Sequence, residues 1–277
     1  MNFFDRLKNG WTIAMLSFKT INENRTLLLF PVVSSVSLII VLLTFFGGGF
    51  LLIGDSIDSL LQDDMMGNIM AYALIFTYYL INYFIIVFFN AALIHCSVKI
   101  FNEEPTDLSD GINYATSKID KIFSWAVLSA TVGTVLQAIR NTGRIGEFVA
   151  GLMGGAWSIL TFFVVPIVIY ENKNVIDSVK ESTAIMREKW GESLAGSVSF
   201  GIFQVLGIIV TLGIFILLVQ VNIILGLAAA MMFLLLTFTV VSAARTIFVA
   251  AVYNHVKGQP TGNFGEDTLD SVFLVNN

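Results

Sequence analysis

The stretch GGAWSILTFFVVPIVIYENKNVIDSVKES, residues 154–182, decides the fold, because an apolar run ends abruptly inside it. Within five residues of Pro166 the chain reaches Glu171, and a charged helical pattern starts at Asn174. A helix needs about 20 apolar residues to cross the hydrocarbon core of a bilayer. The stretch therefore predicts a membrane-spanning helix that stops at a polar boundary, followed by a second helix outside the bilayer.

The composition of the whole chain agrees with a membrane protein. The 277 residues are 56% hydrophobic and 13% charged, with a mean hydropathy of +0.82, whereas soluble domains carry about 25% charged residues. A net charge of −5 lacks the basic excess that nucleic-acid binding needs. The single cysteine, Cys96, excludes an internal disulfide framework and a multi-thiolate metal site. Residues 1–20 alternate charged and apolar residues, so we expect no signal peptide there.

Apolar runs of this kind recur along the chain. We therefore predict an all-α fold, a polytopic membrane helix bundle formed by one transmembrane domain over residues 1–277. The third run is short and polar, which favours a packed position inside the bundle or a helix that enters and leaves by the same face. The six predicted spans cover residues 27–53, 69–93, 122–139, 148–170, 196–219 and 223–244.

The distribution of Lys and Arg predicts the orientation. Thirteen of the fifteen basic residues fall on one side of the six spans, and only Arg140 and Arg144 fall on the other. The loop GDSIDSLLQDDMMGN, residues 54–68, has four Asp and no basic residue. We therefore expect both termini to be cytoplasmic, with the acidic loop outside.

A helix with one apolar face precedes each pair of spans. The chain thus reads as three units, residues 1–103, 104–173 and 174–258, with a tail over 259–277, and predicts a pseudo-threefold parallel repeat. These cytoplasmic amphipathic helices fit either lipid sensing and partner docking or a purely structural position at the interface. Their predicted apolar stripes are Phe4, Leu7, Trp11, Ala14 and Phe18; Leu108, Ile112, Ala115, Ile119 and Ile122; and Val175, Val179, Thr183, Met186 and Trp190.

The predicted spans contain no Asp, Glu, Lys, Arg or His. Intramembrane hydrolases and proton-coupled transporters need titratable groups at depth. His95 and His255 lie far apart in the sequence, outside any metal-binding motif. We therefore predict no catalytic residue, no cofactor and no metal.

Uncharged polar residues do lie within the spans. Along the second span Tyr72, Tyr79, Tyr83 and Asn90 share one face and Asn82 lies beside it, while the third span carries Gln137. Two interpretations remain open, namely the wall of a permeation path and interhelical hydrogen bonding.

Two charged residues mark the inner ends of the fourth and sixth spans. Glu171 follows the fourth span and Arg245 follows the sixth, so we expect an ion pair at the inner boundary. Alternatively, Arg245 reaches lipid phosphates.

Three segments carry a resemblance to a known family: NGWTIAMLSFKTINENRTLLLFPVVS (9–34), VVPIVIYENKNVIDSVKESTAIMREKWGES (164–193) and RTIFVAAVYNHVKGQPTGNF (245–264). They resemble an uncharacterised bacterial family of six-span integral membrane proteins, catalogued as a domain of unknown function. The central segment, with Pro166, Glu171, Ser182 and Trp190, is also similar to the membrane domain of some glycerophosphodiester phosphodiesterases. The resemblance implies a multi-pass protein of the bacterial inner membrane and transfers no catalytic residue.

Together these observations favour a non-enzymatic scaffold or accessory to a membrane partner or lipid process. The alternative is a passive channel or transporter for an ion or small solute. The expected partners are membrane lipid and either a second copy of the chain or another membrane protein, with no nucleic acid.

Overall fold

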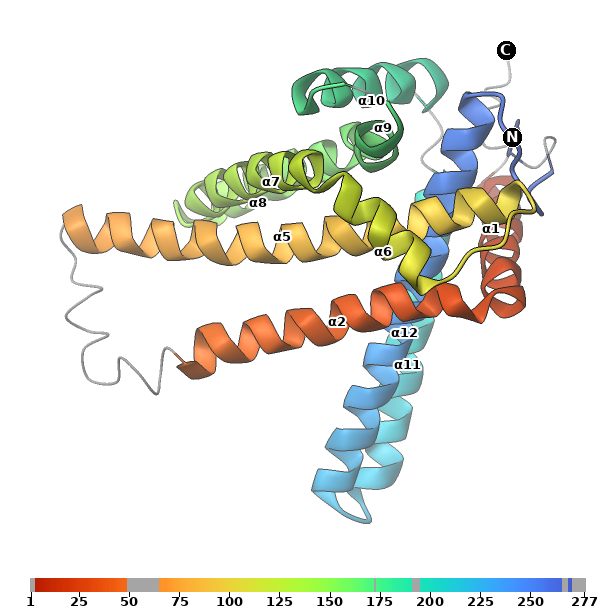
Figure 1. Ribbon diagram of the computed structural model, residues 1–277. Helices are drawn as coiled ribbons and strands as arrows, with labels where there is room; N and C mark the ends of the chain where they lie inside the picture. The colour runs from red at the N-terminus through yellow and green to blue at the C-terminus, as the bar shows by residue number, and fades with distance from the viewer. Residues whose placement is uncertain (1–2, 49–64, 172, 191–194, 266–268, 271–277) are drawn as a thin grey trace. The chain divides into compact units, whose positions relative to one another are not determined.

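The computed structural model describes residues 3–48, 65–171, 173–190, 195–265 and 269–270, and the regular structure in these residues is helical (Figure 1). The all-α prediction is therefore confirmed for the described part of the chain. The elements are α1 (Phe3–Glu23), η1 (Arg25–Leu28), α2 (Leu29–Leu42), η2 (Leu43–Gly48), α5 (Met65–Phe101), α6 (Leu108–Ser117), α7 (Ile119–Arg140), α8 (Arg144–Leu160), α9 (Val164–Tyr170), α10 (Val175–Trp190), α11 (Ala195–Val219) and α12 (Ile223–Val256).

Within the described residues, six stretches of helix are long and apolar enough to cross a membrane, as the sequence predicts. α7 is one uninterrupted helix of 22 residues, so the third stretch does not turn back within its length. Residues 54–64 of the acidic loop and the end of the first predicted span, 49–53, lie outside the described residues. The six stretches are Arg25–Phe45, Ile69–Phe101, Ile119–Arg140, Arg144–Tyr170, Phe200–Val219 and Ile223–Val256.

The chain divides into two compact units, each made of separate segments. Unit 1 contains residues 1–35, 92–112 and 187–277, and unit 2 contains residues 36–91 and 113–186. α2, α5, α6 and α10 each contribute residues to both units. The division into three sequence repeats stays a prediction.

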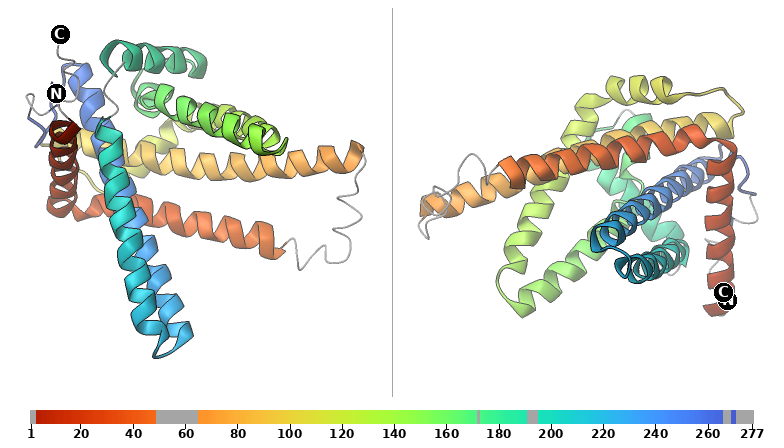
Figure 2. Two further views of the ribbon diagram at one scale, coloured as in Figure 1. Left: turned by 180° about the vertical axis from the view of Figure 1, so that it is seen from behind. Right: turned by 90° about the horizontal axis from the view of Figure 1, so that it is seen from below.

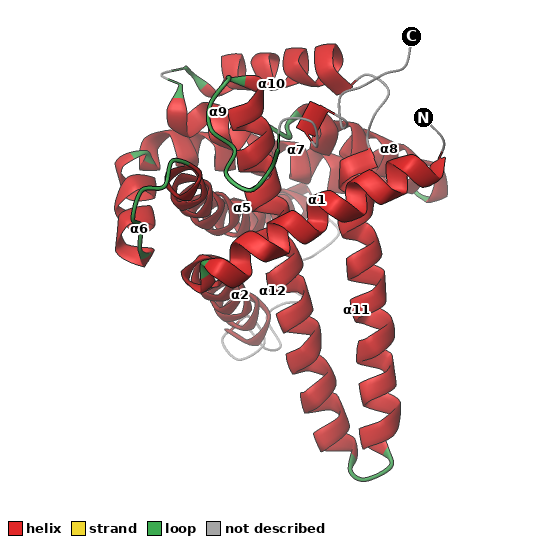
Figure 3. Ribbon diagram, turned by 90° about the vertical axis from the view of Figure 1, so that its right-hand side faces the viewer, coloured by secondary structure: helices red, strands yellow, loops and turns green. Residues whose placement is uncertain are grey.

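In unit 1, α11 and α12 run side by side as an antiparallel hairpin (Figures 1 and 3). Asn222 caps α12, because its Oδ1 accepts hydrogen bonds from the amides of Ile224 at 2.8 Å and Leu225 at 3.2 Å. Gly207 allows close approach of the two helices: a Cβ at this position would lie 2.1 Å from Cγ2 of Thr237. Small residues at such positions are typical of tightly packed apolar helices.

α1 packs against this hairpin (Figure 3). Both small and aromatic side chains of α1 take part in the contact. Ala14, Ser17 and Thr20 are buried, whereas Trp11 is exposed and Phe18 is half-buried. The buried face, which also contains Ile13 and Ile21, is thus rotated from the predicted stripe, and its small residues allow close approach of the helix backbones. Trp11 and Phe18 contact the hairpin at the ring of Phe203 in α11, with centroid distances of 4.6 and 5.0 Å.

The predicted tail packs on unit 1 where it is described. Phe264 is buried, with its ring centroid 6.0 Å from that of Phe101. Gly262 has a φ of +61°, and a Cβ there would lie 2.7 Å from Phe101. The Asn263 amide donates to Glu23 at 2.8 Å, so this segment also contacts the end of α1. The tail is therefore part of the unit 1 core.

In unit 2, α7 and α8 form a second hairpin (Figure 2). The rings of Trp125 and Trp157 stack between them at 5.8 Å. The fourth predicted span, 148–170, is not one helix, because α8 ends at Leu160 and α9 starts at Val164. Pro166 lies in the first turn of α9, where a missing N–H costs little.

Buried and exposed apolar residues are unevenly distributed along the long helices. Residues 243–254 of α12 are mostly buried, whereas most of residues 223–238 are exposed or half-buried and nearly all are apolar. α5 shows the same change, from exposed residues near Ile69 to a buried run over 91–94. Large exposed apolar surfaces are unfavourable in water, so these helix halves fit an apolar solvent.

Candidate functional site at the start of α10

Ser182 of α10 satisfies the backbone where α8 and α9 separate. Its hydroxyl donates to the carbonyl oxygen of Leu160 at 2.7 Å and accepts the amide hydrogen of Phe163 at 3.1 Å. Ser182 and Phe163 are both buried. A break in an apolar helix is tolerated only where neighbours supply such partners. The Ser182 hydroxyl therefore satisfies backbone groups on both sides of the break and holds α10 beside it.

α9 is also held by Tyr114, which lies in the second half of α6. The Tyr114 hydroxyl donates to the carbonyl oxygen of Ile169 at 2.9 Å. Burial raises the pKa of Tyr114 to about 12, because the phenolate would lose hydration there. The ammonium of Lys118 lies 5.8 Å from the centre of the Tyr114 ring. Tyr114 is therefore a neutral hydrogen-bond donor with a structural role.

Three charged side chains connect the end of α9 to α10. Lys173 binds Glu171 at 2.6 Å and also forms an ion pair with Glu181. These hydrogen bonds raise the pKa of Lys173 above its ordinary value. Lys173, Glu171 and Glu181 thus form a charged cluster that connects the linker between α9 and α10 to α10.

The first turn of α10 has its own polar network. Asn174 Oδ1 accepts the Asp177 amide hydrogen at 2.9 Å, and its Nδ2 donates to the Asp177 carboxylate at 2.7 Å. Lys180 donates to the other carboxylate oxygen of Asp177 at 3.1 Å. The hydrogen bond from Lys180, together with that from Asn174, lowers the pKa of Asp177 below its ordinary value. Asn174 therefore caps α10 through its side-chain oxygen.

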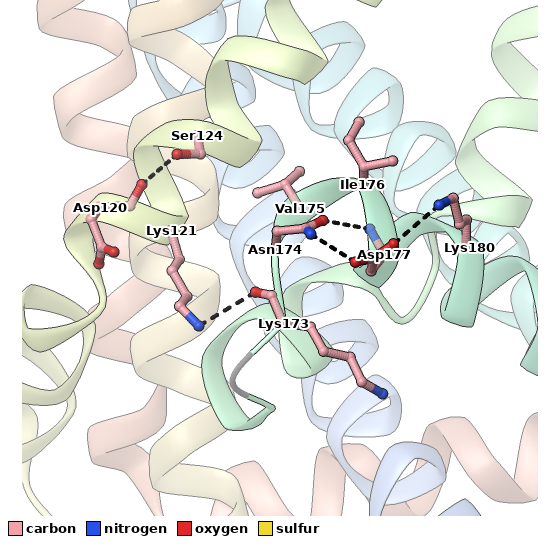
Figure 4. A pocket seen from close by; sticks show the side chains of 9 residues that line it. All are labelled: Asp120, Lys121, Ser124, Lys173, Asn174, Val175, Ile176, Asp177 and Lys180. Atoms are coloured by element: carbon pink, nitrogen blue, oxygen red, sulfur yellow. Dashed lines mark hydrogen bonds and ion pairs between the residues drawn. The ribbon is translucent and has the colours of Figure 1, made fainter.

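A cavity of about 690 Å³ lies between the start of α7 and the start of α10 (Figure 4). Its volume falls in the range of small-molecule sites, about 300–1,000 Å³. Lys121 reaches across it from α7, and its ammonium lies 3.4 Å from the Lys173 carbonyl oxygen. The other lining residues include Asp120, Ser124, Asp177 and Lys180.

A second polar cluster, in unit 1, joins the end of α5 to the start of α6. Lys99 binds Asp110 at 2.6 Å, the Thr106 hydroxyl donates to the same carboxylate at 3.1 Å, and His95 Nε2 lies 4.0 Å from it. The hydrogen bond from Lys99 lowers the pKa of Asp110 below its ordinary value. Beside this cluster Cys96 is buried.

The buried faces of α6 and α10 differ from the apolar stripes predicted for them. α6 ends at Ser117 and a new helix starts at Ile119, so Ile119 is exposed although the spacing places it on the buried face. On α10 the buried residues are Ser178, Ser182 and Met186, with Val175, Val179 and Thr183 half-buried beside them; the side chain of Trp190 lies outside the described part.

The predicted polar residues of α5 are in several different environments. Tyr72 is exposed. Tyr79 and Tyr83 lie against Gly133 of α7, where a Cβ would be 3.4 Å from Tyr79 and 3.3 Å from Tyr83. The Asn82 amide donates to the carbonyl oxygen of Tyr78 at 2.7 Å, within its own helix. The structure thus places Tyr79 and Tyr83 together at one helix contact, and the role of the set stays a prediction.

The remaining predicted residues are also dispersed. Gln137 donates to Asn141 at 3.2 Å, at the end of α7. Asn90 is half-buried on α5. A pair between Glu171 and Arg245 would join unit 2 to unit 1, and it stays a prediction; within unit 2, Glu171 binds Lys173.

Sequence reasoning missed two polar positions. Ser182 appears only as a motif residue in the sequence, because its bonds to α8 and α9 depend on where the span breaks. Gln204 is the only amide side chain in α11, a visible signal, and its Nε2 is buried without a hydrogen-bond partner in the described structure. Within the described residues, no group of three or more His, Cys, Asp or Glu side chains is placed to hold a metal ion.

Comparison with known proteins gives a family match. The family model "Family of unknown function (DUF6159)" matches residues 69–264, which include the cavity, α9 and α10. No curated protein and no solved structure matches the chain.

Proposed function

The chain belongs to the family of unknown function DUF6159, and we propose that it is a non-enzymatic integral protein of the bacterial inner membrane. Six apolar helices support insertion, and the bias of Lys and Arg toward one side supports cytoplasmic termini. On this orientation α10 and the cavity beside it face the cytoplasmic boundary. The protein acts there as a scaffold or accessory for a membrane partner or a lipid process.

The observation that carries this proposal is that the buried polar side chains around α9 and α10 form hydrogen bonds to the protein backbone. In unit 2, the hydroxyls of Ser182 and Tyr114 bond to backbone atoms of Leu160, Phe163 and Ile169. Among the described residues, the buried polar side chains are serines, threonines and one asparagine, several of which bond to backbone carbonyls. Polar side chains used in this way support a rigid helical framework that carries its charged residues at the ends of the helices.

A purification experiment tests the scaffold. The full-length protein is isolated from native membranes in mild detergent, beside a variant carrying Arg187→Glu and Glu188→Lys on the exposed part of α10. We expect a membrane protein at fixed stoichiometry with the natural chain and its loss from the variant. Absence of any stoichiometric protein or bound lipid from both samples contradicts the proposal.

Passive permeation is the alternative outcome of a matched experiment. Protein reconstituted in liposomes is assayed for flux of ions and small solutes, with Tyr83→Ala and Asn90→Ala as variants. Packing of Tyr83 against Gly133 supports a role in helix contact, so we expect no flux. Flux that either variant alters would replace the scaffold with a channel.

A further inference from the structure

We infer that the cavity between α7 and α10 binds the phosphate-bearing headgroup of an anionic phospholipid. This inference rests on the proposed membrane location and names a ligand for the cytoplasmic face. Four observations from unit 2 carry it: the volume of the cavity, its lysines, its place at the ends of two apolar helices, and the exposed apolar residues around it.

The cavity lies where two candidate spans end. α7 starts the third span at Ile119, and the fourth span ends at Tyr170, three residues before the cavity-lining Lys173. Its volume of about 690 Å³ suits a headgroup. Basic pockets at the cytoplasmic ends of spans are typical sites for anionic headgroups.

The cavity is lined by three lysines, Lys121, Lys173 and Lys180, and by two aspartates, Asp120 and Asp177, so positive charge is in excess. Two of the lysines, from different helices, are placed to supply it. Lys121 belongs to α7 and Lys180 to α10, and both line the cavity (Figure 4). Lys173 is less suited to a ligand, because Glu171 and Glu181 already bind its ammonium. The Lys180–Asp177 pair is exposed, and ion pairs in contact with water are weak. A phosphate therefore competes readily for Lys180.

The apolar surroundings favour a lipid over a soluble phosphate. Ile119 is 46% exposed, Phe123 is 49% exposed and Ile176 is 54% exposed. Ile119 and Phe123 belong to the same turns of α7 as Lys121, and Ile176 itself lines the cavity. Large apolar residues beside lysines form the pattern of a membrane interface, with acyl chains below and phosphate above.

The test compares lipids with identical acyl chains. Full-length protein in neutral detergent is titrated with phosphatidylglycerol or phosphatidylcholine, and bound lipid is counted by native mass spectrometry. We expect preferential binding of phosphatidylglycerol, weakened about tenfold or more by Lys121→Gln with Lys180→Gln, since each lysine near an anionic surface contributes about 1 kcal/mol. The matched control, Lys19→Gln with Lys257→Gln, removes the same charge from unit 1 and keeps wild-type binding.

Two further experiments test whether the cavity binds a phospholipid or a soluble phosphate. Inorganic phosphate and glycerol phosphate are added as competitors, and we expect neither to displace the lipid at equal concentration. Ile176→Gln should weaken phospholipid binding while the protein keeps its helix content. Equal binding of both lipids, wild-type binding by the double lysine variant, or displacement by soluble phosphate would each overturn the inference.

Failure of this inference is distinguishable from failure of the proposed function. Membranes are washed at alkaline pH before purification. Protein that stays in the washed membrane yet shows no lipid preference contradicts only the headgroup site. Protein released by the wash contradicts the integral membrane location itself.

Discussion

At the residue scale, Ser182 is the side chain whose role depends most on tertiary structure. Its hydroxyl bridges Leu160 and Phe163 across the gap between α8 and α9. Ser178, one turn earlier and equally buried, donates only to the Asn174 carbonyl oxygen at the start of its own helix. The two serines form a matched pair for measuring what the bridge contributes.

We predict that Ser182→Ala lowers the free energy of unfolding by about 1–3 kcal/mol, because the buried Phe163 amide loses its acceptor. Ser178→Ala should cost less than half as much, since it removes a bond within one helix. Denaturant unfolding in detergent, followed by tryptophan fluorescence, measures both. Equal decreases in the free energy of unfolding for the two variants would show that the Ser182 bridge contributes no more than a bond within one helix.

Asp110 gives a pH-dependent prediction. Its lowered pKa means that its contribution to stability is complete above its ordinary value of 3.8 and is lost as the pH falls through the lower value in the folded protein. The Tm difference between the natural chain and Asp110→Asn should therefore be constant near neutrality and shrink in acid. Glu103→Gln, in the exposed preceding loop, serves as the control. A Tm difference independent of pH would contradict the prediction.

At the scale of elements, the α11–α12 hairpin depends on close contact at one glycine. A Cβ at Gly207 would meet Thr237, whose hydroxyl is bonded to Phe233, whereas a Cβ at Gly213 of the same helix meets nothing within 4 Å. The two positions therefore separate the packing role of glycine from its helix propensity.

We predict that Gly207→Ala destabilises the protein by about 1–3 kcal/mol, because the added methyl overpacks the contact. Gly213→Ala should be neutral or stabilising by up to about 1 kcal/mol, since alanine is the better helix former. Thermal unfolding of both variants in the same detergent measures the difference. A Gly207→Ala variant as stable as Gly213→Ala would rule out the close contact.

The elements also show which features a single sequence predicts. Apolar runs predict the six long helices because hydropathy accumulates over many residues. The break at residues 161–163 is not predictable from Pro166 alone, because it also depends on bonds from Ser182, about 20 positions away. The buried face of α1 contains Ile13 and Ala14, with Trp11 exposed at its edge, a rotation that the spacing of apolar residues alone does not predict.

At the scale of the whole molecule, the orientation of the chain is the central expectation. We predict that Val221→Cys, at the exposed turn between α11 and α12, is labelled from outside the intact cell. Glu104→Cys, in the exposed loop between α5 and α6, should be labelled only after the membrane is permeabilised. Both are made in a Cys96→Ser background and probed with an impermeant maleimide.

Labelling of Glu104→Cys in intact cells would reverse the orientation and move the α7–α10 cavity to the outer face. Labelling of both sites would contradict a sealed six-span arrangement. The sequence predicts this topology from charge alone, whereas the candidate site needed the structure, because Lys121 and Lys180 are 59 positions apart in the chain.

The packing of α1 on α11 and α12 has a consequence for biogenesis. The first helix leaves the ribosome long before its binding surface has been translated, and its buried Ala14, Ser17 and Thr20 must wait for the last hairpin to be inserted. During that interval the contact face of α1 is uncovered and accessible to insertases and chaperones. Protein released early from translation would keep that segment uncovered, which gives quality-control proteases a direct mark of an unfinished molecule.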